Sequence, residues 1–133
     1  MNCIFCKILN NKIPSKKVFE DDEFIAILDA FPANEGHTLV IPKKHFENIF
    51  EIDEETMAKG YKIAKNIAHK IKNKMGIENI NILQNNGAVA GQSVNHFHIH
   101  IIPRKENDTI TIKSEVVKID EQRLEEIKNL LSN

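Results

Sequence analysis

Within residues 95–102, polar and apolar residues alternate strictly from His96 to Ile101. This period of two predicts a β-strand, because successive strand side chains point to opposite faces of a sheet. Three histidines then share one face and three apolar residues share the other: His96, His98 and His100 on the first, Phe97, Ile99 and Ile101 on the second. Three imidazoles suit a buried core poorly, because each ring has two nitrogens that need partners. The pattern favours a functional site over a solvated or buried structural face.

A helical period governs residues 53–75, where apolar residues recur at steps of three and four. The predicted stripe consists of Met57, Tyr61, Ala64, Ala68, Ile71 and Met75, widened by Ile63 and Ile67. Asp53 fits the N-cap and Gly76 the position after the last turn. Gly60 inside this helix costs about 1 kcal/mol relative to Ala. We expect a long helix packed on a sheet, with His69 on its surface and without a role.

Shorter patterns complete the expected elements. Strands are predicted at 17–20, 24–29, 37–41 and 77–83, with a possible strand at 109–117. Residues 4–9 form a helical turn, 45–50 a turn or short helix, and 120–131 a terminal helix. Strands and helices segregate along the chain rather than alternate, which favours an α+β fold. We expect a five-stranded antiparallel sheet carrying one long helix and a short C-terminal helix.

Composition describes an ordinary globular chain. Its 133 residues and 15.2 kDa fit a single domain, 1–133, large enough for one core. The net charge of −1 supplies no electrostatic case for binding nucleic acid or an anionic membrane. No apolar run is long enough to span a membrane, and no signal-peptide core follows Met1. We therefore expect a cytoplasmic protein.

The only two cysteines, Cys3 and Cys6, stand in a C-x-x-C spacing. A reducing cytosol disfavours a structural disulfide. A thioredoxin-like redox pair follows a strand, and no strand has room to precede Cys3. Half of a metal site and two free thiols both remain open from the residues alone.

The three histidines and the loop before them can support chemistry at phosphorus. A neutral imidazole is a competent nucleophile near pH 7, since its reference pKa is about 6.5. In the loop 84–95, Gly91 permits close approach of the backbone and Ser93 offers a hydroxyl, while Gln92 and Asn85 offer uncharged amides. Because this loop contains no Arg or Lys, it suits a phosphoryl group with a single negative charge.

The run His96–Ile102 matches the motif His-φ-His-φ-His-φ-φ, where φ is an apolar residue. With the segments 36–45 and 91–93, it resembles the histidine triad (HIT) nucleotide hydrolases, in the branch of the histidine triad nucleotide-binding proteins. The cysteine pair and the ending Ile102-Pro103-Arg104 look like the prokaryotic zinc-containing members. The resemblance covers residues 1–104 as a motif-matching core and leaves 105–133 as a variable C-terminal extension.

The resemblance implies roles for individual residues. His98 would be the nucleophile that forms a covalent nucleotidyl intermediate, which water then hydrolyses. His100, Ser93 and the backbone at Gly91 would contact the α-phosphate, with His37 as a supporting histidine. Gln92 and Asn85 would lie near the bridging atom and the leaving group. The nucleoside would be held by Asp29 at the ribose and by four apolar residues around the purine: Ile4, Phe5, Ile8 and Ile27.

The resemblance also implies a metal site, an assembly and an activity. Cys3, Cys6, His45 and His96 would hold a structural zinc, and a homodimer would pair the long helices and adjacent sheet edges. The expected activity is that of a purine nucleoside phosphoramidate hydrolase, similar to adenosine 5′-monophosphoramidase. Hydrolysis of dinucleoside polyphosphates and a non-catalytic nucleotide-binding module are the alternatives. Nucleotidyl transfer to a sugar phosphate usually needs a larger substrate domain than 133 residues allow.

Overall fold

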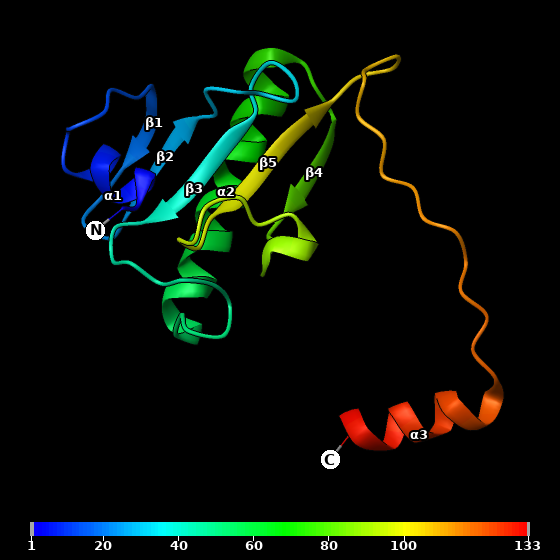
Figure 1. Ribbon diagram of the computed structural model, residues 1–133. Helices are drawn as coiled ribbons and strands as arrows, with labels where there is room; N and C mark the ends of the chain where they lie inside the picture. Colours follow the sequence, from blue (N-terminus) through cyan, green and yellow to red (C-terminus); the bar gives the residue numbers. More distant parts are fainter. Residues whose placement is uncertain (1, 133) are drawn as a thin grey trace.

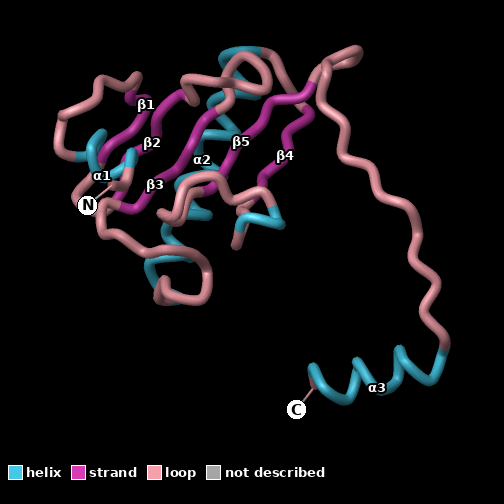
Figure 2. The backbone as a smooth tube through the Cα atoms, viewed as in Figure 1, coloured by secondary structure: helices cyan, strands magenta, loops and turns pink. Residues whose placement is uncertain are grey.

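The computed structural model describes residues 2–132 and has an α+β fold, as predicted (Figures 1 and 2). The elements in chain order are α1 (Ile4–Leu9), β1 (Lys17–Glu20), β2 (Phe24–Leu28), β3 (Thr38–Pro42), α2 (Glu54–Met75), β4 (Asn79–Leu83), the 3₁₀ turn η1 (Ala88–Ala90), β5 (Ile99–Arg104) and α3 (Glu121–Leu131). The strands form one antiparallel sheet in the order β1-β2-β3-β5-β4. This arrangement confirms the predicted five-stranded sheet.

The central strands are apolar on both faces because a helix lies on each side of the sheet. Phe24, Ala26 and Val40 belong to the core that α2 covers. Ile25, Ile27, Leu39 and Ile41 belong to a second core, which α1 closes with Phe5 and Ile8. Strands buried on both faces lose the alternation of a half-exposed strand. The short helix α1 therefore sits on the same sheet face as one end of the histidine segment.

Helix α2 begins and ends where the capping residues predict. The Asp53 carboxylate accepts a hydrogen bond from Thr56 N, and Gly76 adopts the left-handed conformation with φ 72°. Its buried residues are Gly60, Ile63, Ala64, Ile67 and Ile71, of which all but Gly60 belong to the predicted stripe. Tyr61 and Met75 are 39% and 44% exposed. The prediction was wrong for these two residues, because periodicity alone does not fix which edge of a wide stripe meets the sheet.

Gly60 explains why the helix turns this face inward. A Cβ atom added there would lie 3.1 Å from Phe24 Cε2 and 3.3 Å from Ile99 Cδ1. Both neighbours are fully buried core residues. The glycine therefore permits the close approach of α2 to β2 and β5, which offsets its low helix propensity.

The histidine segment is only partly a strand. The strand β5 starts at Ile99 instead of Asn95, so His96 and His98 precede the sheet ladder and only His100 lies in it. Phe97 N bonds to Phe46 O at 2.7 Å, which ties this approach to the loop after β3. The prediction of a single strand over 95–102 was therefore wrong at its start. Within 45–50, a turn begins at Ile49 and no helix forms, which matches the first of the two forms expected there.

The possible strand at 109–117 is absent from the structure. These residues join no ladder, and among residues 2–132 no strand pairs with the outer side of β4. The chain then leaves the body and ends in α3, which lies apart from the sheet (Figure 1). In the part of the chain that the structure describes, no helix has the length and apolar character needed to cross a membrane.

Candidate active site

A cleft of about 820 Å³ opens beside α1, between β2 and the segment that leads into β5. Its walls hold all four of the apolar residues expected around a purine, together with four polar residues expected at the sugar and phosphate. These residues are Ile4, Phe5, Ile8 and Ile27, and Asp29, Ser93, His98 and His100. The fold therefore brings these residues from four separate segments to one concave surface.

His98 presents one defined nitrogen to this cleft. Its Nδ1 lies 2.7 Å from the carbonyl oxygen of His96. A carbonyl can only accept, so Nδ1 carries the proton and the lone pair of the neutral ring is on Nε2. Within residues 2–132, no hydrogen-bond partner meets Nε2. Burial lowers the pKa of His98, so the ring is neutral and nucleophilic near pH 7.

A chain of hydrogen bonds determines which ring nitrogen of His37 and of His100 carries the proton. Ala33 N donates to His37 Nδ1 at 3.0 Å. The proton of neutral His37 is then on Nε2, which lies 3.0 Å from His100 Nδ1 and donates to it. His100 consequently carries its own proton on Nε2. Burial lowers the pKa of His37, and it lowers the pKa of His100 to about 4. Both rings are thus neutral, and the Nε2–H of His100, at the end of this series of hydrogen bonds, is available as a donor.

Asp29 directly follows β2 and lines the cleft. Its Oδ1 accepts a hydrogen bond from Phe31 N at 2.9 Å, and its Oδ2 lies 3.5 Å from His37 Nε2. The carboxylate is therefore held in place while remaining on the cleft wall. A fixed carboxylate beside an apolar pocket can accept hydrogen bonds from paired hydroxyl groups.

Gln92 does not lie where the sequence predicted. Its side chain is buried, with Oε1 accepting from Gly87 N at 2.8 Å and Nε2 donating to Glu47 O at 2.7 Å and Val94 O at 3.0 Å. Every polar function of this amide is used by backbone groups. Gln92 therefore braces two loops instead of reaching toward a leaving group, and it does not line the cleft.

The loop before the histidines offers fewer phosphate donors than expected. Gly91 N and Gln92 N donate to Ala88 O and Gly87 O within the loop. Asn85 Nδ2 lies 3.4 Å from Gly91 O and also faces the loop. Gly91 takes the left-handed conformation, φ 92°, that its residue type permits. Ser93, which is exposed and lines the cleft, remains the loop's side-chain donor at this surface.

A second cluster lies behind the cleft, where α1 meets the histidine segment. Cys3 Sγ and Cys6 Sγ lie 3.5 Å and 3.6 Å from His96 Nδ1, and Cys6 Sγ lies 3.5 Å from His45 Nδ1. His96 Nε2 donates to Pro42 O at 2.8 Å, so Nδ1 holds the lone pair that faces the sulfurs. A tetrahedral zinc site spaces its sulfur and nitrogen ligands by roughly 3.5 Å. These four side chains can hold a metal ion.

Asp29, His37 and His100 also lie close enough together to suggest a metal site. The hydrogen bonds exclude it in this arrangement. Because His37 Nδ1 accepts from Ala33 N, His37 Nε2 carries a proton and has no lone pair for a cation. The three residues form a hydrogen-bond relay.

Three contributions to the site are not visible in the sequence. The amide of Ala33 and the carbonyl of Pro42 each select a histidine tautomer, and backbone groups leave no signature in residue type. Phe31 lines the outer cleft and is 91% exposed. The sequence feature that could have indicated this role is the position of the aromatic side chain, two residues after Asp29.

A model of the HIT domain matches residues 10–107. The chain belongs to the HIT family. An uncharacterised HIT-like protein of Methanocaldococcus jannaschii is 48% identical over 128 residues, which span 95% of this chain and 98% of that protein. An adenosine 5′-monophosphoramidase of Schizosaccharomyces pombe is 44% identical over 104 residues, spanning 78% of this chain and 75% of that enzyme.

Solved HIT structures share the fold. The crystal structure of a HIT family member from Bacillus subtilis has 39% sequence identity and a TM-score of 0.92, covering 99% of this chain and 96% of that one. A zinc-bound histidine triad protein from Mycobacterium smegmatis has 34% identity and a TM-score of 0.79, covering 86% and 84%.

Proposed function

We propose that this HIT protein hydrolyses purine nucleoside phosphoramidates at the α-phosphate, releasing the 5′-nucleotide and an amine. One observation carries the proposal: the 2.7 Å hydrogen bond from His98 Nδ1 to His96 O leaves the Nε2 lone pair facing a cleft of nucleotide size. A histidine that only stabilised the fold would have both nitrogens satisfied by the protein.

In the proposed first step, His98 Nε2 attacks the α-phosphorus. A nitrogen–phosphorus bond forms to the ring, the phosphorus–nitrogen bond of the substrate breaks, and the amine leaves with a proton taken up from solvent. In the second step, water attacks the nucleotidyl-histidine, which regenerates the neutral ring and yields the 5′-nucleotide. The low pKa of His98 supports this role, because the ring is unprotonated at neutral pH.

Neutral donors would stabilise the negative charge that grows on the phosphoryl oxygens. The relay from Ala33 through His37 leaves His100 Nε2 as an N–H donor on the cleft wall, and Ser93 adds a hydroxyl. Donors held in place before the reaction need no reorganisation when charge develops. The absence of Lys and Arg from the loop 84–95 suits a singly charged phosphodiester-like group better than a terminal phosphate.

The rest of the cleft fits a nucleoside. Asp29 would accept hydrogen bonds from the ribose hydroxyls. The apolar wall would hold the purine between α1 and β2, through Ile4, Phe5, Ile8 and Ile27. Support for a nucleotide substrate also comes from the relatives named adenosine 5′-monophosphoramidase.

We also propose that the metal held by Cys3, Cys6, His45 and His96 is a structural zinc. The set of two thiolates and two imidazoles would fill a tetrahedral site and leave no position for substrate. Zinc at this place would tie α1, which forms part of the cleft wall, to the segment that carries His98. The zinc-bound Mycobacterium smegmatis relative supports the choice of metal. We further propose a homodimer, as the family resemblance implies.

The catalytic proposal predicts that His98→Ala loses at least a thousandfold in kcat/KM with adenosine 5′-monophosphoramidate. The measurement is release of the 5′-nucleotide, with His69→Ala on the exposed face of α2 as the matched control that retains activity. Acid quench of the wild-type enzyme in a single turnover should trap a nucleotidyl adduct. Turnover by His98→Ala at the wild-type rate would refute the nucleophile. Tight nucleotide binding without turnover in the wild type would indicate a binding module.

The substrate class is tested by comparing kcat/KM for the phosphoramidate and for a diadenosine polyphosphate under the same conditions. We expect the phosphoramidate to be preferred by at least tenfold. A preference for the diadenosine polyphosphate would reassign the enzyme without changing the covalent step.

A further inference from the structure

The hydrogen bond that selects the His37 tautomer comes from a loop. Residues 29–37, which we call the β2–β3 loop, contain no helix or strand. Within this loop Ala33 N donates to His37 Nδ1 at 3.0 Å, and His37 N donates to Asn34 O at 3.1 Å. A backbone N–H can fix the proton of a histidine ring only while the loop that carries it stays in place. The proton on His37 Nε2 therefore depends on what holds the β2–β3 loop.

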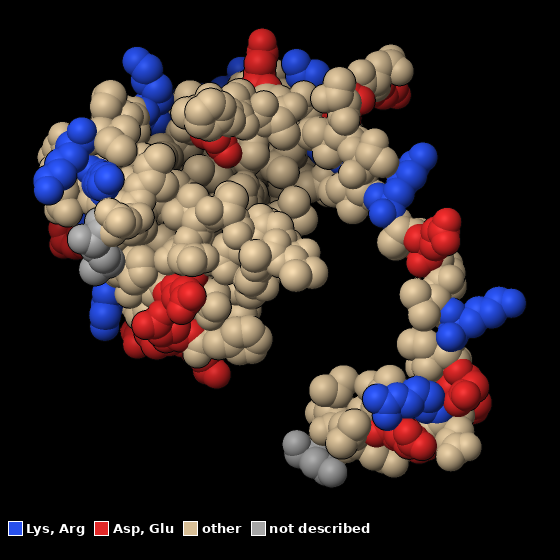
Figure 3. All heavy atoms as spheres, in the orientation of Figure 1, with Lys and Arg blue, Asp and Glu red and all other residues tan. Residues whose placement is uncertain are grey.

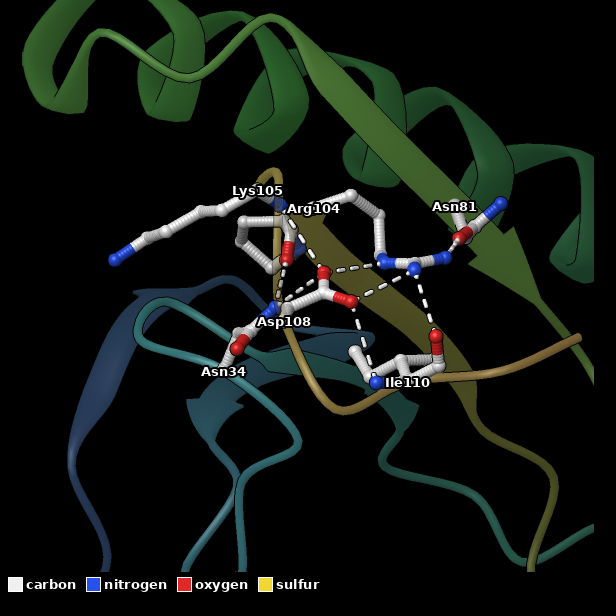
Figure 4. A network of polar contacts seen from close by, with 7 residues as sticks. Asn34, Asn81, Arg104, Lys105, Asp108 and Ile110 are labelled. Carbon is white, nitrogen blue, oxygen red and sulfur yellow. Dashed lines mark hydrogen bonds and ion pairs between the residues drawn. The ribbon is translucent and has the colours of Figure 1, made fainter.

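Asn34 ties this loop to the strand that carries His100 (Figure 4). Its Nδ2 donates to Pro103 O at 2.9 Å and to Asp108 Oδ2 at 3.0 Å. The amide nitrogen has two protons, and these two bonds use both. Pro103 lies in β5, three residues after His100. One side chain thus joins the loop that supplies Ala33 N to the strand that supplies the N–H donor of the cleft.

Asp108 presents a fixed acceptor to Asn34. Arg104 Nε and Nη2 donate to its carboxylate at 2.7 and 2.9 Å, and Lys105 N and Ile110 N donate to it at 3.1 and 3.2 Å. The Arg104 guanidinium, with these backbone donors, holds the pKa of Asp108 far below its usual range. The carboxylate is therefore ionised and can only accept, which requires the NH₂ group of Asn34 and not its oxygen to face it.

The Asp108 side chain is enclosed. Acidic side chains protrude from the surface at several places in the space-filling view (Figure 3). The side chain of Asp108 is only 5% exposed, while that of Glu35, next to Asn34, is 83% exposed. Ion pairs of exposed carboxylates contribute little, but an enclosed carboxylate that accepts from several donors is held in one geometry. Asp108 can therefore position the group that it binds.

Packing also seats the β2–β3 loop on the end of β5. Gly36 adopts a φ of 87°, and a Cβ atom added there would lie 3.1 Å from Pro103 Cγ and 3.1 Å from Met75 Cε of α2. This close contact leaves little room for a side chain at position 36. The loop therefore meets Pro103 both through this contact and through the Asn34 hydrogen bond.

Asp29 is the other group that favours a proton on His37 Nε2, and it is the weaker constraint. Its Oδ2 lies 3.5 Å from Nε2, at the limit of a hydrogen bond, whereas the bond from Ala33 N to Nδ1 is 3.0 Å long. Asp29 also lines the cleft, where it would bind the ribose in the proposed function. The loop amide would remain in place when the ribose hydroxyls occupy this carboxylate.

We propose that Asn34 and Asp108 are positioning residues of the active site. Asp108 holds Asn34, Asn34 holds the β2–β3 loop, and the loop keeps the protons of His37 and His100 on their Nε2 atoms. Neither Asn34 nor Asp108 lines the cleft. The catalytic consequence rests on the proposed function, because it concerns the N–H that His100 donates to the phosphate. The inference gives a role to Asp108, which lies outside the motif-matching core 1–104.

Loss of this support would reverse the relay. If Ala33 N moves away, His37 can carry its proton on Nδ1, and the lone pair on its Nε2 then accepts from His100 Nδ1. His100 Nε2 would in that case hold a lone pair toward the cleft, which repels phosphoryl oxygen atoms instead of donating to them. The purine wall on α1 is not part of this series of bonds. We therefore expect the chemical step to be impaired more than nucleotide binding.

NMR reads the histidine tautomers without any substrate. In full-length protein labelled with ¹⁵N-histidine, long-range ¹H–¹⁵N correlation spectra at neutral pH distinguish the protonated from the unprotonated ring nitrogen. The wild type should show His37 and His100 protonated on Nε2. Asn34→Ala and Asp108→Ala should each show protonation on Nδ1 or an average of the two forms, while Glu35→Ala, in the same loop, should match the wild type. Wild-type tautomers in both Asn34→Ala and Asp108→Ala would overturn the proposal.

Turnover of adenosine 5′-monophosphoramidate tests the catalytic consequence. Asn34→Ala should lower kcat by roughly tenfold to a hundredfold, with KM changed by less than about threefold. An unchanged kcat in a variant whose tautomers have shifted would contradict the positioning role. A wild type without turnover would instead refute the proposed function, and the NMR comparison would still decide whether Asn34 and Asp108 set the histidine tautomers.

Discussion

At the scale of single residues, the three histidines of the motif differ only in what meets their second nitrogen. His96 donates its Nε2–H to Pro42 O, so the lone pair on its Nδ1 faces the cysteines. His98 donates its Nδ1–H to His96 O, so the lone pair on its Nε2 faces the cleft. His37 donates to His100 and makes it an N–H donor. One residue type thereby supplies a candidate metal ligand, a candidate nucleophile and a candidate hydrogen-bond donor to phosphate.

The buried relay predicts how stability depends on pH. Burial lowers the folded-state pKa of His37, and that of His100 to about 4, while the unfolded value is about 6.5. Below pH 6.5 the unfolded state therefore binds more protons, so stability falls as pH decreases from 6.5 toward 4. For His100 alone the loss between pH 7 and pH 5 is on the order of 1–2 kcal/mol.

Thermal unfolding at pH 7 and pH 5 measures this loss. His100→Asn should narrow the difference in Tm between the two pH values. His69→Asn, on the exposed face of α2, should leave the difference unchanged. An equal change in Tm between pH 7 and pH 5 in the wild type, His100→Asn and His69→Asn would show that His100 does not titrate in this range.

At the scale of elements, α2 shows how a local cost is offset by packing. Its ends follow from Asp53 and Gly76, which act within one turn of the helix. Its rotation follows from contacts with β2 and β5, where only the absence of a side chain at Gly60 allows the observed approach. The helical stripe in the sequence is wide enough to suit more than one rotation.

Gly60→Ala is therefore predicted to destabilise the protein, although Ala is the better helix former. The gain in helix propensity is about 1 kcal/mol. A methyl group 3.1 Å from the buried Phe24 ring requires the core to shift, at about 1–3 kcal/mol. We expect a net decrease of about 1 kcal/mol in the free energy of unfolding, measured by urea denaturation.

Asn66→Ala, at an exposed position of the same helix, is the matched control. The substitution raises helix propensity and the new side chain does not contact the core, so the variant should be at least as stable as the wild type. A Gly60→Ala variant as stable as this control would show that the helix has room to move outward.

At the scale of the whole molecule, the cysteine and histidine cluster joins distant parts of the chain. Cys3 and Cys6 lie at the N-terminus, His45 after β3, and His96 ahead of β5. α1 is only six residues long and owes its position to this cluster and to the packing of Phe5 and Ile8. A metal ion here would hold together the wall of the cleft.

Removing the metal should destabilise the protein. Protein purified without added zinc should contain one zinc per chain by elemental analysis. The double variant Cys3→Ser, Cys6→Ser should lose it, with a Tm lower by roughly 5 °C or more. His69→Asn again serves as a control that retains zinc. Stoichiometric zinc in the double variant would refute these ligands.

The sequence by itself determined what depends on neighbours along the chain. The strands and α2 follow from short periods and capping residues. The donor set of Cys3, Cys6, His45 and His96 was implied only by the resemblance to the HIT family, and the structure brings its four side chains together. Errors concentrated where alternation continued past the true element, as at His96, or where a pattern suggested a strand that pairs with no other, as in 109–117.

Tertiary structure alone decided what depends on partners distant in sequence. The proton positions on His96, His98 and His37 are set by the backbone at Pro42, His96 and Ala33. Gln92 became a brace because three backbone groups of two loops meet its amide, which removed it from the cleft. Hydrogen-bond partners are chosen by geometry in space, and a linear pattern of residue types does not contain that geometry.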